Sequence, residues 1–188
     1  MTAVPAGTAV DYTVTYLEMT ARPDGPAPPL PDHVRLERAI DPPVWYFLAL
    51  YDAVGRDYEW QDRFEQAEAD PAALQAFVRD REVVIWTATG HGWPQGFFVL
   101  DWRRAGVCDL AYFGLVPQAV GAGWGRALLE TAVQTGWARD GVAKMTVNTC
   151  TLDHPRALSL YRKLGFVPVA REARRRVLVH DHDPARFP

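Results

Sequence analysis

Three alternating glycines are the strongest candidates for chemistry in this chain, because their type and spacing suit the binding of an anion. Gly121, Gly123 and Gly125 stand in the stretch 115–129, after a short apolar run and before a helical pattern. A glycine-rich turn between a strand and a helix leaves its amides and the first helical N–H groups free for a negatively charged group. We therefore expect a phosphate-bearing cofactor at the start of this helix, although a tight turn without a ligand would carry the same glycines.

The glycine spacing excludes two common phosphate sites. A Walker loop requires a lysine after its glycines, and none follows here. A dinucleotide-binding turn requires G-x-G-x-x-G and an acidic residue after the next strand. This turn reads G-x-G-x-G, and the next strand ends in Asn148-Thr149-Cys150. The glycines alone therefore leave the cofactor open.

A second block, DHPRALSLYRKLGF at 153–166, narrows the choice. Together with the glycine turn it resembles the GNAT superfamily of N-acetyltransferases, which use acetyl-CoA. That family has V-x-P, then [QR]-x-x-G-x-[GA], and further on N-x-x-A-x-x-L-Y-x-x-x-G-F. Val116-Pro117 stands just before the glycine turn, and Gly123-Trp124-Gly125 matches the G-x-G core of this pattern. The matches in the second part are Ala157, Leu160, Tyr161, Gly165 and Phe166.

Two positions depart from the family pattern. Val120 stands where the family has Gln or Arg, and His154 stands where it has Asn. The first change removes a polar side chain but keeps the amides that bind the phosphates. The second alters a side chain that would contact the cofactor. Both changes favour an alternative function, a non-catalytic GNAT-like module that binds CoA as a regulator.

The resemblance implies an α/β GNAT fold, a mixed and mostly antiparallel twisted sheet with helices on both faces. It also implies acetyl-CoA as the co-substrate, with the pyrophosphate at a helix N-terminus that carries about half a positive charge. The pantetheine amides are expected to pair with exposed strand backbone, as an added strand does. The expected cofactor-binding residues are Leu115, Val116, Gly121, Ala122, Gly123, Trp124, Gly125, Arg126 and His154.

Acetyl transfer to an amine requires a base and a site for the oxyanion. Asp109 lies seven residues before Val116, where several GNAT enzymes place a carboxylate that serves as base. That residue is usually Glu, so the shorter Asp109 is expected to act through a bridging water. The alternative for Asp109 is a strand-end residue bonded to a neighbouring turn. The oxyanion is expected beside the main-chain N–H of Leu115 or Val116.

Departure of the CoA thiolate requires an acid, and the resemblance assigns this role to Tyr161. Its phenol pKa of about 10 lies above the thiol pKa of about 8.5, so Tyr161 should assist the reaction without being indispensable. Tyr161 also shares helical i, i+3, i+4, i+7 spacing with Ala157, Leu160 and Leu164, which is the pattern of a core residue.

The acceptor is expected to bind against residues 45–63, because the first two helices of the GNAT fold usually form part of the acceptor wall. Trp45, Tyr46 and Trp60 are the expected substrate-binding residues, and their alternative is a place in the core. The acceptor is a small-molecule or peptide amine that the sequence does not name. Transfer of an acyl group longer than acetyl, from a longer acyl-CoA, is a further alternative.

Hydrophobic periodicity predicts the elements that position these residues. Residues 9–20 alternate as a strand, and the stretch 22–31, with its five prolines, is expected to be an irregular loop. Helices are expected from Pro43 to Gly55 and from Pro71 to Arg79, the second after an Asp70 cap. Three strands are expected at 82–88, 95–102 and 108–116. This order suits a GNAT domain.

Composition predicts an ordinary globular chain in one domain, 1–188, with a surface tail at 181–188. A net charge of −3 argues against a nucleic-acid partner. Two cysteines without a Cys-x-x-Cys pair argue against disulfides and a zinc site, so no metal is expected. Without a signal peptide or a long apolar run, we expect no membrane partner and a cytoplasmic location. A homodimer is left open.

Overall fold

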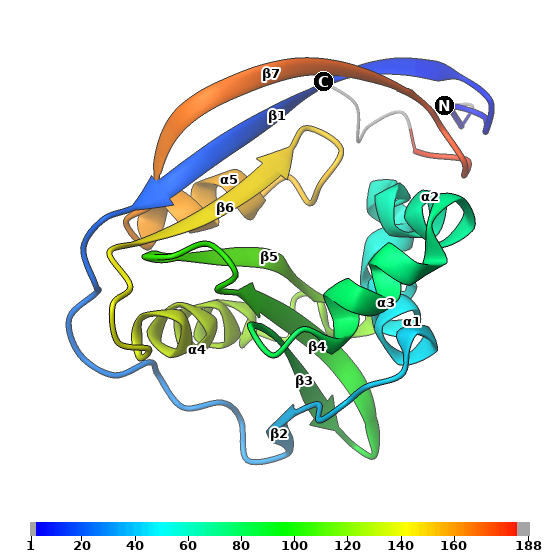
Figure 1. Ribbon diagram of the computed structural model, residues 1–188. Coiled ribbons are helices and arrows are strands. Elements are labelled where there is room, and N and C mark those ends of the chain that lie inside the picture. The colour runs from blue at the N-terminus through cyan, green and yellow to red at the C-terminus, as the bar shows by residue number, and fades with distance from the viewer. Residues whose placement is uncertain (1–2, 184–188) are drawn as a thin grey trace.

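The protein forms one seven-stranded sheet with helices on both faces, as a computed structural model of residues 3–183 describes it (Figure 1). The strands are β1 (Ala9–Met19), β2 (Val34–Arg38), β3 (Val83–Gly90), β4 (Trp93–Asp101), β5 (Val107–Leu115), β6 (Lys144–Cys150) and β7 (Val167–Val177). The helices are α1 (Val44–Gly55), α2 (Asp62–Ala69), α3 (Pro71–Arg79), α4 (Gly125–Trp137) and α5 (Ala157–Lys163), with 3-10 turns η1 (Arg56–Tyr58) and η2 (Pro117–Ala119).

The strands lie in the order β2-β3-β4-β5-β6-β1-β7, and all neighbours are antiparallel except β5 and β6. The predicted meander is therefore confirmed, and so is the mixed, mostly antiparallel sheet. The N-terminal strand β1 lies between β6 and β7, with Tyr16 opposite Asn148 on one side and Ala170 on the other. The sequence predicts this strand but not its position in the sheet, because the alternation of apolar and polar residues identifies a strand but not its neighbours.

β5 and β6 pair only where they begin. Residues 107–109 pair in parallel with residues 144–146, and within the described chain no later pair joins the two strands. From this point the half of the sheet with β2–β5 and the half with β6, β1 and β7 diverge (Figure 1). The divergence leaves main-chain groups of both strands without a strand partner, as the resemblance implies.

Two predicted helices agree with the structure and one helix was missed. α1 ends at Gly55, and α3 spans Pro71–Arg79 with the Asp70 carboxylate accepting the Ala73 N–H at 2.9 Å. α2 has no buried residue, so its sequence lacks the apolar stripe by which a helix is recognised. It is positioned instead by its contacts with α3.

The connection between α1 and α2 is bound to the C-terminal segment through Glu59. The Glu59 side chain is fully buried and accepts the N–H groups of Val179 and His180, and it bonds His182 Nε2 at 2.8 Å. His182 is only 7% exposed and pairs with Val4. Of the predicted surface tail, His182 is therefore buried through its bond to Glu59, whereas Asp181 and Asp183 are exposed. Residues 184–188 of that tail lie outside the described residues.

Glu59→Ala is expected to lower the free energy of unfolding by about 1.5–3 kcal/mol or more, because buried N–H groups lose their charged hydrogen-bond acceptor. Burial alone would raise the pKa of Glu59, but the hydrogen bonds from Val179, His182 and His180 outweigh it and lower the pKa. The stabilisation is thus fully present above the ordinary carboxyl pKa of about 4.3 and is lost as the pH falls through the lowered folded value.

Urea unfolding of Glu59→Ala and of a matched control measures this contribution. Glu65→Ala removes a carboxylate that also pairs with the C-terminal strand, at Arg176, but its side chain is 67% exposed. Exposed pairs contribute about 0–1 kcal/mol, so this control should unfold close to the wild type. Equal unfolding midpoints for the two variants would contradict the structural role of Glu59.

Candidate functional site

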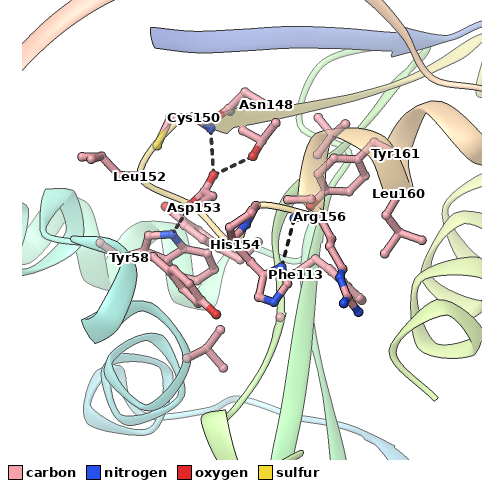
Figure 2. A pocket seen from close by; sticks show the side chains of 18 of the residues that line it. Tyr58, Phe113, Asn148, Cys150, Leu152, Asp153, His154, Arg156, Leu160 and Tyr161 are labelled. Carbon is pink, nitrogen blue, oxygen red and sulfur yellow. Dashed lines mark hydrogen bonds between the residues drawn. The ribbon is translucent and has the colours of Figure 1, made fainter. Parts of the chain in front are cut away.

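A cavity with a volume of about 970 Å³ opens where β5 and β6 diverge. One side is lined by the turn before α4 and by the start of α5, and the other by the α1–α2 connection, β1 and the end of β7. Figure 2 shows Tyr58 and Phe113 on one side and Asn148, His154 and Tyr161 facing them across the hollow. The cavity therefore runs from the predicted cofactor side to the predicted acceptor side.

The glycine turn presents unpaired main-chain donors to this cavity. Gly121 and Gly123 have φ values of 86° and 89°, and no atom lies within 4 Å of a Cβ built on either. Among the described residues, the N–H groups of Gly121, Gly123, Gly125 and Arg126 have no hydrogen-bond partner in the protein. These donors surround the N-terminus of α4, which also carries positive partial charge. The turn can therefore bind a phosphate group without rearrangement.

Strand β5 offers a second set of donors, which includes the expected Leu115 but not Val116. The Val116 N–H donates to the Gln95 carbonyl at 3.0 Å, and the Val116 carbonyl accepts the Ala119 N–H at 2.9 Å. Val116 therefore has no free main-chain donor for an oxyanion. In an antiparallel pair, alternate residues point away from the partner strand. Given this register, Phe113 and Leu115 direct their N–H groups away from β4, toward the divergence.

Most of the predicted cofactor-binding residues line the cavity. These are Leu115, Gly121, Gly123, Gly125, Arg126 and His154. Val116, Ala122 and Trp124 do not line it. Trp124 is buried instead, and within the described chain its indole Nε1 has no partner. Arg126 forms an ion pair with Glu130 at 2.6 Å, on the first turns of α4.

His154 lines the cavity from the loop before α5, where the family pattern has Asn. Its Nδ1 accepts the Arg156 N–H at 3.1 Å, so the neutral ring carries its proton on Nε2. Its ring also meets Tyr58 edge-on, with the ring centroids 6.2 Å apart. A neutral His154 is therefore a hydrogen-bond donor at Nε2, as the amide nitrogen of an asparagine is.

Tyr161 is buried against Phe166 and also lines the cavity. Its position therefore suits both expected alternatives, a core residue and a group that reaches the ligand. Burial, with a smaller contribution from the charge of Asp153, raises the pKa of Tyr161 above its ordinary value. Within the described chain its hydroxyl has no hydrogen-bond partner. The side chain therefore keeps its proton at neutral pH and has it available for a ligand.

Asp109 lies next to the cavity and not in its wall. It lines an adjoining hollow that shares Tyr16, Val147 and Asn148 with the main cavity. The Thr146 hydroxyl donates to its carboxylate across the last β5–β6 pair. Burial raises the pKa of Asp109, and the Thr146 hydrogen bond opposes this only in part. A carboxyl with a raised pKa is a stronger base than an ordinary one.

Of the three residues predicted to bind the acceptor, only Trp60 lines the cavity. Trp45 is 68% exposed at the start of α1 and Tyr46 bonds Thr87, and neither lines the cavity. Trp60 does line it, and its indole N–H donates to Asp153 at 2.9 Å. A Cβ on Gly55 would come within 2.4 Å of the Trp60 ring, so only glycine lets this ring lie against the end of α1.

Several cavity residues were not predicted. Asp153 accepts hydrogen bonds from Thr149 and from the Cys150 N–H as well as from Trp60, and so joins the two walls (Figure 2). Tyr12 and Tyr16 of β1 also line the cavity. Their alternation on one strand face is visible in the sequence, but only the position of β1 in the sheet brings them to this site.

Metal-binding clusters and membrane-spanning helices are both lacking in the part of the chain that the structure describes. Across residues 3–183, no group of three or more His, Cys, Asp or Glu side chains is arranged to hold a metal ion. Within the same range, no helix has both the length and the apolar composition that crossing a membrane requires.

A diverging mixed sheet beside a glycine turn at a helix N-terminus defines an α/β protein that can hold a long phosphate-bearing ligand. Residues 28–166 match the sequence model of the acetyltransferase (GNAT) family. This match covers more than half of the chain, and the chain belongs to that family. A comparison with curated proteins gave no match.

Solved structures support the same fold. A GCN5-related N-acetyltransferase from Sphaerobacter thermophilus is 18% identical, with a TM-score of 0.59 over 99% of this chain and 56% of its own. A GCN5-related N-acetyltransferase from Kribbella flavida is 20% identical and has a TM-score of 0.57. The match covers 92% of this chain and 58% of that one. An aminoglycoside acetyltransferase from an uncultured soil metagenomic sample, in complex with trehalose, is 16% identical, with a TM-score of 0.51 over 71% and 88%. The chain thus spans little more than half the length of the first two.

Proposed function

We propose that this protein transfers an acetyl group from acetyl-CoA to the primary amine of an acceptor by direct attack. The observation that carries the proposal is one cavity that has an unpaired β5 edge and free N–H groups at Gly121, Gly123, Gly125 and Arg126. In this arrangement the turn holds the pyrophosphate, and the β5 edge pairs with the pantetheine arm. The Phe113 and Leu115 N–H groups polarise the thioester carbonyl, and such donors contribute several kcal/mol when they are held in place.

Asp109 supplies the base of the proposed reaction. At pH 7 only about one alkyl ammonium group in a thousand or fewer is neutral, since its pKa is about 10.4. Asp109 takes the proton from the amine through water in the hollow that adjoins the cavity. The amine nitrogen then bonds to the acetyl carbon and loses its second proton to water, the carbon–sulfur bond breaks, and the sulfur leaves as thiolate. The N-acetylated product and free CoA result.

Tyr161 returns a proton to the departing thiolate, and Tyr161→Phe tests this role. We expect the variant to lower kcat several-fold with the Kd of acetyl-CoA unchanged. The effect is moderate because the raised pKa of Tyr161 makes proton donation to a thiolate uphill. Steady-state thiol release and calorimetry measure the two quantities. Unchanged turnover in the variant would exclude Tyr161 as the acid.

The competing function is a CoA-binding regulator without turnover, which the residues Val120 and His154 favour. Incubation with acetyl-CoA and a panel of primary amines, with detection of free thiol, separates the two functions. Thiol release that depends on an amine supports the enzyme. Binding of acetyl-CoA by calorimetry without thiol release for any amine supports the regulator. Absence of acetyl-CoA binding contradicts both.

A further inference from the structure

Aromatic rings dominate the walls of the cavity. Six of the seven tyrosines in the chain line it, together with Trp60 and Phe113. Tyr12 and Tyr16 come from β1 and Tyr58 from the 3-10 turn η1. Residues 9–19, which form β1, lie outside the range that matches the family. Tyr12 and Tyr16 therefore lie outside the matched range, whereas the other rings of the cavity lie within it.

The carboxylates on the acceptor side are already engaged within the protein. Glu59 is fully buried and bonded to the C-terminal segment, so it cannot reach a ligand. Both carboxylate oxygens of Asp153 accept hydrogen bonds, one from Trp60 and the other from residues 149 and 150. Asp62 is 76% exposed and lies 3.7 Å from Arg176. Asp153 forms no salt bridge among the described residues, but it already accepts three hydrogen bonds, so little of its acceptor capacity is left for a second positive charge on the acceptor.

The hollow beside the cavity contains one carboxylate without an ionic partner. Glu18 pairs there with Lys144, and Asp101 pairs with Arg103. Asp109 has no salt bridge among the described residues and accepts a hydrogen bond from a hydroxyl only. One available carboxylate suits one reacting amine.

The two cavity arginines of β7 are engaged as well. Arg174 donates to the Tyr16 hydroxyl and to Glu172, both at 2.9 Å. Arg176 donates to the Glu59 carbonyl at 2.6 Å and to Glu65 at 3.1 Å. The buried Nε of Arg176 still has no hydrogen-bond partner among the described residues, so a ligand in the cavity would find one free donor on β7.

We infer that the acceptor is a monoamine carried on an aromatic body, an inference that rests on the proposed acetyl transfer. Aromatic walls favour a flat ring by stacked and edge-on contacts. The engaged carboxylates disfavour polycationic acceptors, such as polyamines and aminoglycosides. The amine itself is placed toward Asp109, and the ring is placed among Tyr12, Tyr58 and Trp60.

An amine panel tests the acceptor class. Thiol release from acetyl-CoA is compared for phenethylamine and tryptamine, for spermidine and kanamycin, and for glycine. We expect kcat/KM for the better aryl monoamine to exceed that of every other amine at least tenfold. A smaller ratio, or preference for a charged acceptor, overturns the inference and leaves the acetyltransferase standing. No thiol release with any amine, while acetyl-CoA binds, overturns the proposed function itself and the acceptor class with it.

Variants of two rings from different elements test the placement. Tyr12→Leu and Tyr58→Leu are each expected to raise the KM for phenethylamine about two- to tenfold without changing the KM for acetyl-CoA. Trp93→Leu removes a partly exposed ring at the start of β4, outside the cavity, and should change neither value. Because the two tyrosines lie on separate elements, a folding defect in one variant leaves the other as the test. An unchanged acceptor KM in the folded variants would overturn the placement.

Discussion

Replacing Asp109 with asparagine is expected to lower kcat/KM for amine acetylation by about 10²–10⁴-fold, the range that a positioned base contributes. Asparagine is similar in size and keeps an oxygen for the Thr146 hydroxyl, so the β5–β6 junction should stay intact. The proton of the ammonium group then has no carboxylate to receive it. The Kd of acetyl-CoA should not change, because Asp109 lies outside the cofactor side of the cavity.

The pH profile distinguishes a base from a merely structural carboxylate. Activity requires ionised Asp109, so kcat/KM should fall as the pH drops through its raised pKa, which lies above the ordinary value of about 3.9. The Thr146 hydrogen bond favours the ionised form. Thr146→Val should therefore raise the pKa further and move the acidic limb to higher pH. The titration of the amine is the same for both enzymes, so the difference between the profiles reports on Asp109.

A control for the pH experiment is Thr131→Val. The Thr131 hydroxyl bonds only the main chain of α4, outside both the cavity and the adjoining hollow. Its profile should coincide with that of the wild type. If Thr146→Val also leaves the acidic limb in place, or if Asp109→Asn keeps full activity, Asp109 is not the base.

Gly123→Val is expected to weaken acetyl-CoA binding by about ten- to a hundredfold. A β-branched residue at a φ of 89° is strained by about 1–3 kcal/mol, and relief of this strain would turn the N–H groups of the turn away from the phosphate position. The new side chain also enters the space that the turn leaves open, since no protein atom lies within 4 Å of its Cβ. Calorimetry with acetyl-CoA measures the change in Kd.

Gly141→Val is a matched control for this strain. Gly141 has a φ of 82° and no atom within 4 Å of a built Cβ, but it lies in the turn before β6, away from the cavity. Both variants should lose similar stability, and only Gly123→Val should lose affinity for acetyl-CoA. Equal Kd values for the two variants would show that the glycine turn does not hold the cofactor.

Much of the fold can be read from the sequence, because its signals are local. Asp70 followed by Pro71 predicts the start of α3, since a capping side chain and a proline act within a single turn. The glycines at 121 and 123 predict an open turn, since only glycine adopts a positive φ without strain. These signals, with the block 153–166, were sufficient to identify the family. α2 escaped prediction because it has no apolar stripe.

The site itself was only partly predictable. Tyr161 and the three turn glycines were expected in the cavity and line it, whereas Trp45 was expected there and is exposed on α1. Helical spacing does not say which face of α1 meets the sheet, so an aromatic residue near the cavity in sequence can point away from it. A free N–H was expected at Leu115 or Val116. The Val116 N–H is bonded to β4, whereas those of Leu115 and Phe113 point away from it, because the pairing register with β4 decides which amides are used.

The sequence by itself determined the strand–turn–helix unit and with it the class of cofactor, because backbone conformation at a glycine turn depends on a few adjacent residues. Only the tertiary structure decided what faces the acceptor. β1 lies between β6 and β7, and this strand order, which no local pattern encodes, brings Tyr12 and Tyr16 to the cavity. Side chains distant in the chain meet across a cavity only through strand order and register, which depend on the packing of the whole sheet.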